Sequence, residues 1–60
     1  MAQLNQMELN SIREIVAGHQ TMAAKLTDYA SKCQDTQIKQ MFEQASQEAN
    51  KSAQNLLQML

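Results

Sequence analysis

His19, Glu48 and Cys33 are the residues of this 60-residue chain whose types suggest chemistry. An imidazole and a carboxylate are common metal ligands, and helical bundles that hold two iron ions combine several Glu residues with a Glu-x-x-His repeat. Neither Glu14 nor Glu48 has a His three positions later, so this repeat is missing. We therefore expect no metal and no cofactor. We interpret His19 as a packing residue, with one ring nitrogen hydrogen-bonded to Ser52 and the other to Glu48 or to water. The alternative is a metal-binding remnant that uses His19 and Glu48.

Cys33 is the only cysteine, so the chain cannot form an internal disulfide or a cysteine-rich zinc site. A thiol at the end of a helix gains nothing from the helix dipole, which disfavours the thiolate there. We interpret Cys33 as a small core residue. No catalytic constellation is visible in the sequence, which predicts a protein that is not an enzyme.

The composition favours helices and does not favour binding to polyanions or membranes. The chain has one Gly and no Pro, and its net charge is −1, which argues against nucleic-acid binding. No apolar run approaches the roughly 20 residues that span a bilayer, and the N-terminus does not resemble a secretion signal. These features predict synthesis in the cytoplasm and no membrane association.

A first helix is predicted over residues of about 8–33. Its apolar positions alternate in steps of four and three, as on one face of a helix. Asn5 and Glu8 have the spacing of a capping box at its start, and Asn10 is a second possible start. Ile15, Met22 and Tyr29 flank the apolar row and widen it. The row consists of Ile12, Val16, His19, Ala23, Leu26, Ala30 and Cys33.

A second helix is predicted over residues of about 36–59, because the apolar pattern resumes there with a shift of one residue. Asp35 is a suitable N-cap for a helix that begins at Thr36. The pattern predicts an all-α fold, an antiparallel helical hairpin with residues 1–60 as one domain. The rival interpretation is a single bent helix of about 50 residues, since no Gly or Pro breaks the chain near the shift. The second row consists of Ile38, Phe42, Ala45, Ala49, Ser52, Leu56 and Met59.

A turn near residues 34 and 35 would bring together residues whose numbers sum to about 71. The small Ala45, Ala49 and Ala53 would then face bulkier residues of the first helix. The apolar stripe is too wide for one partner helix, which predicts a homodimer that forms a four-helix bundle with twofold symmetry. An adaptor whose groove binds a partner helix is a further alternative. The residues predicted to form the interface are Ile12, Val16, Met22, Leu26, Phe42 and Leu56.

Three segments, residues 10–20, 25–30 and 33–42, resemble the Coat F family of spore-coat proteins from endospore-forming bacteria. The best-matching positions are Lys25, Tyr29, Asp35 and Ile38. The resemblance implies a ferritin-like helical fold, a structural role without catalytic residues, location in the spore coat, and other spore-coat proteins as partners. We therefore expect a non-enzymatic structural component that acts through helix–helix self-association.

Overall fold

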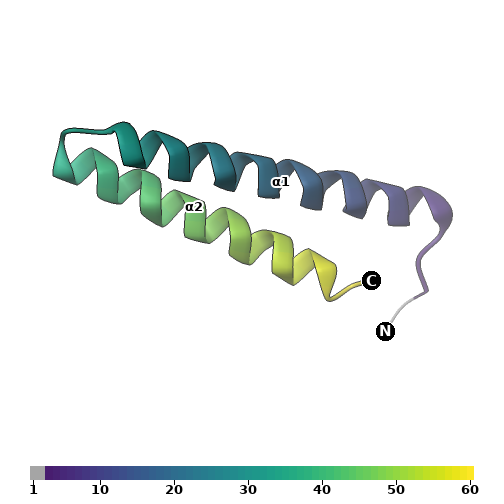
Figure 1. Cartoon of the computed structure of the whole chain (residues 1–60). Helices are drawn as coiled ribbons and strands as arrows, with labels where there is room; N and C mark the ends of the chain where they lie inside the picture. Colours follow the sequence, from purple (N-terminus) through teal and green to yellow (C-terminus); the bar gives the residue numbers. More distant parts are fainter. Residues whose placement is uncertain (1–2) are drawn as a thin grey trace.

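The computed structural model describes residues 3–60, which form two antiparallel α-helices joined by a tight turn (Figure 1). Helix α1 spans Gln6–Lys32 and helix α2 spans Thr36–Leu57. The predicted hairpin is confirmed, although α1 begins two residues earlier and α2 ends two residues earlier than expected. Because the chain reverses between the helices, the rival interpretation of one long helix is wrong.

The predicted capping box begins α1. The side chain of Asn5 accepts a hydrogen bond from the backbone N–H of Glu8 at 2.7 Å, and the Glu8 carboxylate accepts one from the N–H of Asn5 at 3.0 Å. The two bonds satisfy backbone donors that a helix otherwise leaves free at its first turn. They also explain why the helix starts as early as Gln6.

The turn is formed by extended backbone at Cys33 and Asp35. Cys33 has φ −75° and ψ 136°, and Asp35 has φ −77° and ψ 121°. No residue in the described range 3–60 has a positive φ, so the reversal does not require glycine. Asp35 Oδ1 accepts hydrogen bonds from the N–H groups of Gln37 at 2.8 Å and Ile38 at 3.2 Å, which confirms Asp35 as the N-cap of α2.

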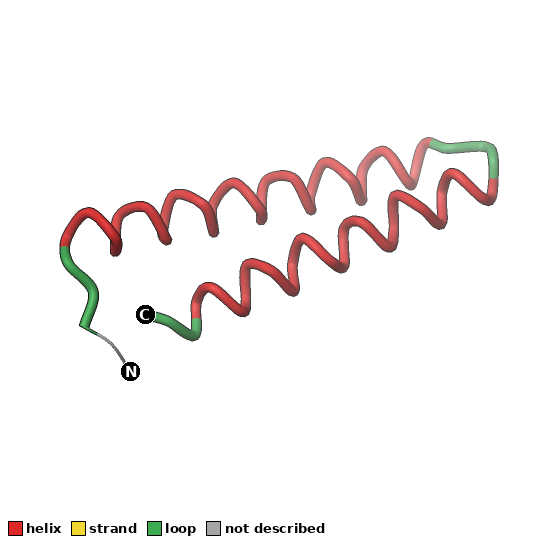
Figure 2. The backbone as a smooth tube through the Cα atoms, turned by 180° about the vertical axis from the view of Figure 1, so that it is seen from behind, coloured by secondary structure: helices red, strands yellow, loops and turns green. Residues whose placement is uncertain are grey.

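The helices lie side by side along their length, in the views from both sides (Figures 1 and 2). Their register agrees with the predicted sum of about 71, since the rings of Tyr29 and Phe42 lie 6.0 Å apart between centroids. Small residues occupy the centre of the contact, which lets the two backbones approach closely. The buried residues are Val16, Ala23 and Ala30 of α1 and Ser46 and Ala53 of α2.

The apolar row of α2 differs from the prediction. Ser46 and Ala53 are the buried residues, whereas Ala45 and Ser52, each one position earlier, are only half-buried. Ile38 and Met59 of the predicted row are exposed, at 46% and 51%. The physical reason is that small residues of α2 meet small residues of α1 at the centre, and the larger side chains are displaced to the flanks of the contact.

Candidate functional site

The two helices leave most of their large apolar side chains uncovered. In the described part of the chain, no large side chain is fully buried. Met22 and Tyr29 of α1 are 52% and 51% exposed, and Met41 of α2 is 69% exposed. Isolated exposed apolar residues are ordinary, but an apolar set this extensive on a small helical protein indicates an interaction surface.

These exposed side chains gather on one broad side of the hairpin. In α1 the row Ile15, Met22 and Tyr29 lies one position before the buried row Val16, Ala23 and Ala30. In α2, Ile38 belongs to the row that lies one position before the buried Ser46 and Ala53, and Met59 continues the spacing of this row just beyond the end of α2. Because α1 and α2 are antiparallel, the residues one position before the buried row point to the same broad side of the pair in both helices. We call the set Ile15, Met22, Tyr29, Ile38, Met41 and Met59 the exposed apolar face.

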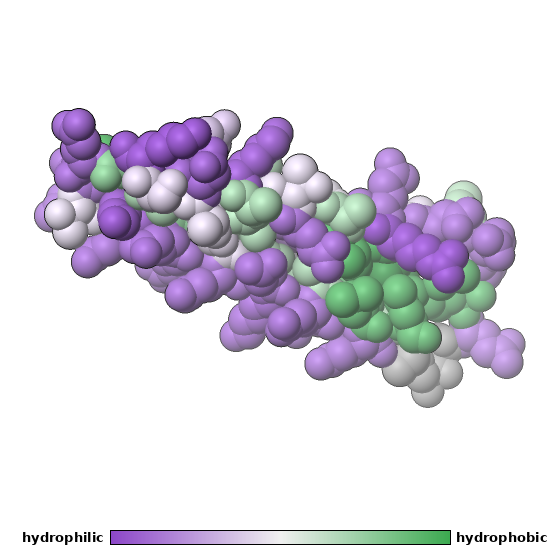
Figure 3. Space-filling model, viewed as in Figure 1, coloured by the Kyte–Doolittle hydropathy of each residue, from purple (hydrophilic) through white to green (hydrophobic). Residues whose placement is uncertain are grey.

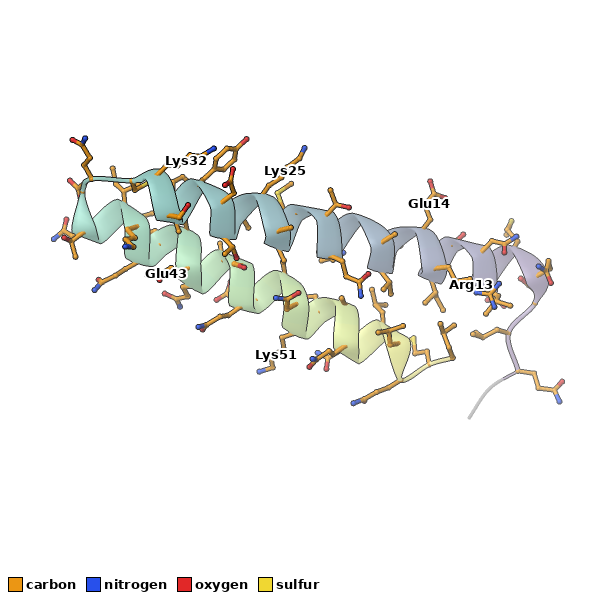
Figure 4. The ribbon with its side chains drawn as sticks, in the orientation of Figure 1. Arg13, Glu14, Lys25, Lys32, Glu43 and Lys51 are labelled. Atoms are coloured by element: carbon orange, nitrogen blue, oxygen red, sulfur yellow. The ribbon has the colours of Figure 1, made fainter. Side chains whose placement is uncertain are left out.

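Charged side chains lie mainly around the outer edges of the hairpin. In Figure 4, Glu14, Lys25 and Lys32 project from α1 away from α2, and Lys51 projects from α2 away from α1. Within residues 3–60 the structure contains one ion pair, between Lys32 Nζ and Asp28 Oδ2 at 3.0 Å, and both side chains are exposed. Such a pair adds little stability. The charges therefore leave the exposed apolar face free for contact with an apolar partner.

The opposite end of the hairpin from the turn carries a second apolar area. Figure 3 shows polar side chains over most of one side, with apolar side chains gathered where α1 begins and α2 ends. Leu57 and Leu60 in this region are 43% and 51% exposed. The area is separate in sequence from Met22 and Tyr29, so mutations can distinguish the two.

His19 does not have the partners expected from the sequence. Its ring Nδ1–H donates a hydrogen bond to the backbone oxygen of Ile15, at 2.9 Å, on its own helix. Helix geometry brings an i−4 carbonyl within reach of the ring, so neither Ser52 nor Glu48 is needed to satisfy Nδ1. Among residues 3–60 there is no cluster of three or more His, Cys, Asp or Glu side chains suited to a metal ion. The metal-binding alternative at His19 and Glu48 stays a prediction.

An open, mainly apolar groove runs along α1 beside His19. Its lining consists of Ile15, Gly18, His19 and Met22. All four residues come from consecutive turns of one helix, so the groove lies on the surface of α1 and not between the helices. It falls within the exposed apolar face.

A small polar cluster at the centre of the helix contact was not foreseen. Ser46 Oγ donates to the backbone oxygen of Ala23 at 3.0 Å, and lies 2.8 Å from Thr27 Oγ1. Because the single hydroxyl proton of Ser46 goes to Ala23, Thr27 is the donor in the second bond. The signal in the sequence was the position of Ser46, one residue beyond Ala45, combined with a Thr at the facing position of α1.

The six residues predicted to form the dimer interface lie at different depths. Val16 is buried between the two helices of one hairpin, and Met22 is exposed to solvent on the exposed apolar face. The other four, Ile12, Leu26, Phe42 and Leu56, are half-buried along the edges of the helix contact.

The comparisons with known proteins do not assign the chain to a family. No family model matches it, and neither a curated protein nor a solved structure matches it. The resemblance to the Coat F family therefore stays a prediction from the sequence. In the described residues, neither helix is long and apolar enough to cross a membrane.

Proposed function

We propose that this chain is a non-enzymatic structural protein that works by self-association of its helical hairpin. The observation that carries the proposal is the absence of any fully buried large side chain in residues 3–60, beside an exposed apolar face on one side of the hairpin. Burying a Met, Leu or Ile side chain contributes about 1.5–3 kcal/mol, whereas the Ala residues at the centre of this contact contribute far less. A second hairpin supplies the missing burial.

The size of the chain supports the same proposal. A domain of 60 residues buries only about 60% of the surface that its extended chain exposes, which makes a monomer marginally stable. Two helices alone form a layer with two open sides. Pairing two such layers gives a four-helix bundle, in which the apolar stripes of all four helices share one core.

The sequence resemblance extends the proposal to a location. We propose that the assembled hairpins belong to the spore coat of an endospore-forming bacterium, together with other coat proteins. The resemblance supports this location, and the self-associating surface suits a component of a dense protein layer. A fluorescent fusion expressed in a sporulating host is expected to collect at the spore periphery, and diffuse fluorescence throughout sporulation would contradict the proposed location.

Sedimentation equilibrium tests the self-association directly. We expect a dimer at micromolar concentration, with a melting temperature that rises as the protein concentration rises, since association stabilises the folded state by mass action. A folded monomer over the whole concentration range would overturn the proposal and favour the adaptor alternative, in which the exposed apolar face binds a helix of another protein.

A further inference from the structure

Gly18 is a residue that the hairpin itself does not explain. It is the only glycine, and it lies near the middle of α1 between Ala17 and His19. Its φ is not positive, so the backbone does not require glycine there. A Cβ built at Gly18 meets no atom within 4 Å, so packing within the hairpin does not require glycine either.

Glycine weakens a helix relative to alanine, so a mid-helix glycine with no internal role suggests that something outside the hairpin approaches the backbone closely. Gly18 lines the open groove with Ile15, His19 and Met22, on the same side as the exposed apolar face. Large side chains thus stand on both sides of a depression at Gly18. A surface with projections and a depression can complement a second copy of itself, because in a twofold interface each residue meets the other copy's surface in the same way.

The broad side of the hairpin is about the size that a stable dimer needs. It extends 46 Å by 16 Å, an area of roughly 700 Å². Interfaces of ordinary size bury about 600–1,000 Å² on each partner, so such a dimer would use most of this side of each hairpin. A contact restricted to the groove itself would be much smaller.

The charge distribution also favours a second copy. The row Ile15, Met22 and Tyr29, at the centre of this face on α1, contains no Asp, Glu, Lys or Arg. Lys25 and Lys32 follow Gly18 at intervals of seven residues, so they lie along the outer edge of the same face. In Figure 4 both project from α1 away from α2. Protein interfaces combine a core depleted in charge with a polar rim, and the arrangement of these residues has the same form.

We propose that a second copy of this chain docks face to face on the exposed apolar face, with a side chain of each copy packed into the groove over Gly18 of the other. This rests on the proposed function and adds the surface and the residue that determine how the copies meet. Gly18 lies close to the middle of α1, so copies that meet there overlap along most of their length.

The test compares Gly18→Leu and Gly18→Ala with the matched variant Ala24→Leu. Ala24 is exposed on α1, on the side opposite the groove, so the added side chain has the same size but does not block the face. Leu and Ala are both better helix formers than Gly, so the variants at Gly18 keep their helical circular dichroism at high protein concentration.

Sedimentation equilibrium of the full chain gives the readout. We expect Gly18→Leu to weaken dimerisation by roughly tenfold or more, Gly18→Ala to weaken it by a smaller factor, and Ala24→Leu to leave it unchanged. Two results would overturn the proposed face: a dimer that forms equally well with Gly18→Leu, or equal weakening by Gly18→Leu and Ala24→Leu. Self-association would then use another surface, such as the area around Leu57 and Leu60. If the wild-type chain does not dimerise at any concentration, the proposed function itself is wrong.

Discussion

Ser46 carries a polar group at the centre of an otherwise apolar contact, and its hydroxyl both donates and accepts a hydrogen bond there. Its hydroxyl donates to Ala23 O, which as a helix carbonyl also has a backbone partner, and accepts from Thr27. The side chain is small enough for α1 and α2 to approach closely. Its size, more than its hydrogen bonds, should therefore determine how well a replacement is tolerated.

Ser46→Ala is expected to reduce the free energy of unfolding by less than about 1 kcal/mol, because Thr27 is exposed and water can replace the lost partner. Ser46→Leu is expected to cost about 1–3 kcal/mol, because the longer side chain forces the helices apart. Urea denaturation at a fixed protein concentration measures both.

The neighbouring exposed residue gives the control, since Gln47→Leu places the same side chain outside the contact. A larger loss with Ser46→Ala than with Ser46→Leu would show that the hydrogen bonds, and not the close approach, hold this layer together.

Sequence patterns could not place Ser46 or the partner of His19. The predicted row contains Ala45 and Ser52, whereas the buried residues are Ser46 and Ala53, one position later. Ala and Ser are similarly small, so residue type does not distinguish the two positions. His19 was expected to reach across to α2, but its ring bonds to Ile15 O on its own helix. Both errors arise because spacing predicts which side a residue occupies but not which of several nearby partners it contacts.

The turn is the element that the sequence predicted most fully. Asp35 provides a helix start, and the one-residue shift of the apolar rows between Cys33 and Ile38 marks the reversal. The sequence could not show how a turn forms without glycine, because extended backbone at Cys33 and Asp35 is open to many residue types. The cap and the extended backbone lead to separate predictions.

Asp35→Ala is expected to lower the free energy of unfolding by about 1 kcal/mol, because the N–H groups of Gln37 and Ile38 lose their shared acceptor. Asp28→Ala removes a carboxylate from an exposed ion pair and is expected to cost less than about 0.5 kcal/mol. Thermal denaturation of the two variants at one concentration compares them, and equal losses would mean that the cap contributes no more than a surface charge.

Thr36→Pro is expected to be tolerated, because proline suits the first position of a helix. Proline also restricts the preceding residue to extended backbone, which Asp35 already adopts. Met41→Pro, in the interior of α2, is the control and is expected to cost about 3 kcal/mol or more. Loss of helical circular dichroism in Thr36→Pro comparable to that in Met41→Pro would contradict the observed turn.

For the whole molecule, the hairpin and the assembly differ in what holds them together. Within one hairpin, contacts between small side chains and the Tyr29–Phe42 pair fix the register of α1 and α2. In the proposed dimer, the larger side chains of the exposed apolar face supply the burial. The sequence predicted that the stripe was too wide for one partner, but the arrangement of two copies depends on surface shape, which residue spacing does not determine.

Met22→Ser distinguishes a covered face from an open one. Met22 is 52% exposed in the hairpin, so in a monomer its truncation removes little buried area. In a dimer that covers this face, we expect a loss of about 1.5–3 kcal/mol in the free energy of association, or a dissociation constant raised by roughly tenfold or more. Met7→Ser is the matched control, because Met7 is 73% exposed near the start of α1 and outside the exposed apolar face. Sedimentation equilibrium of both variants measures the dissociation constants. Equal constants for Met22→Ser, Met7→Ser and the wild-type chain would mean that the side chain of Met22 stays in water when the copies associate.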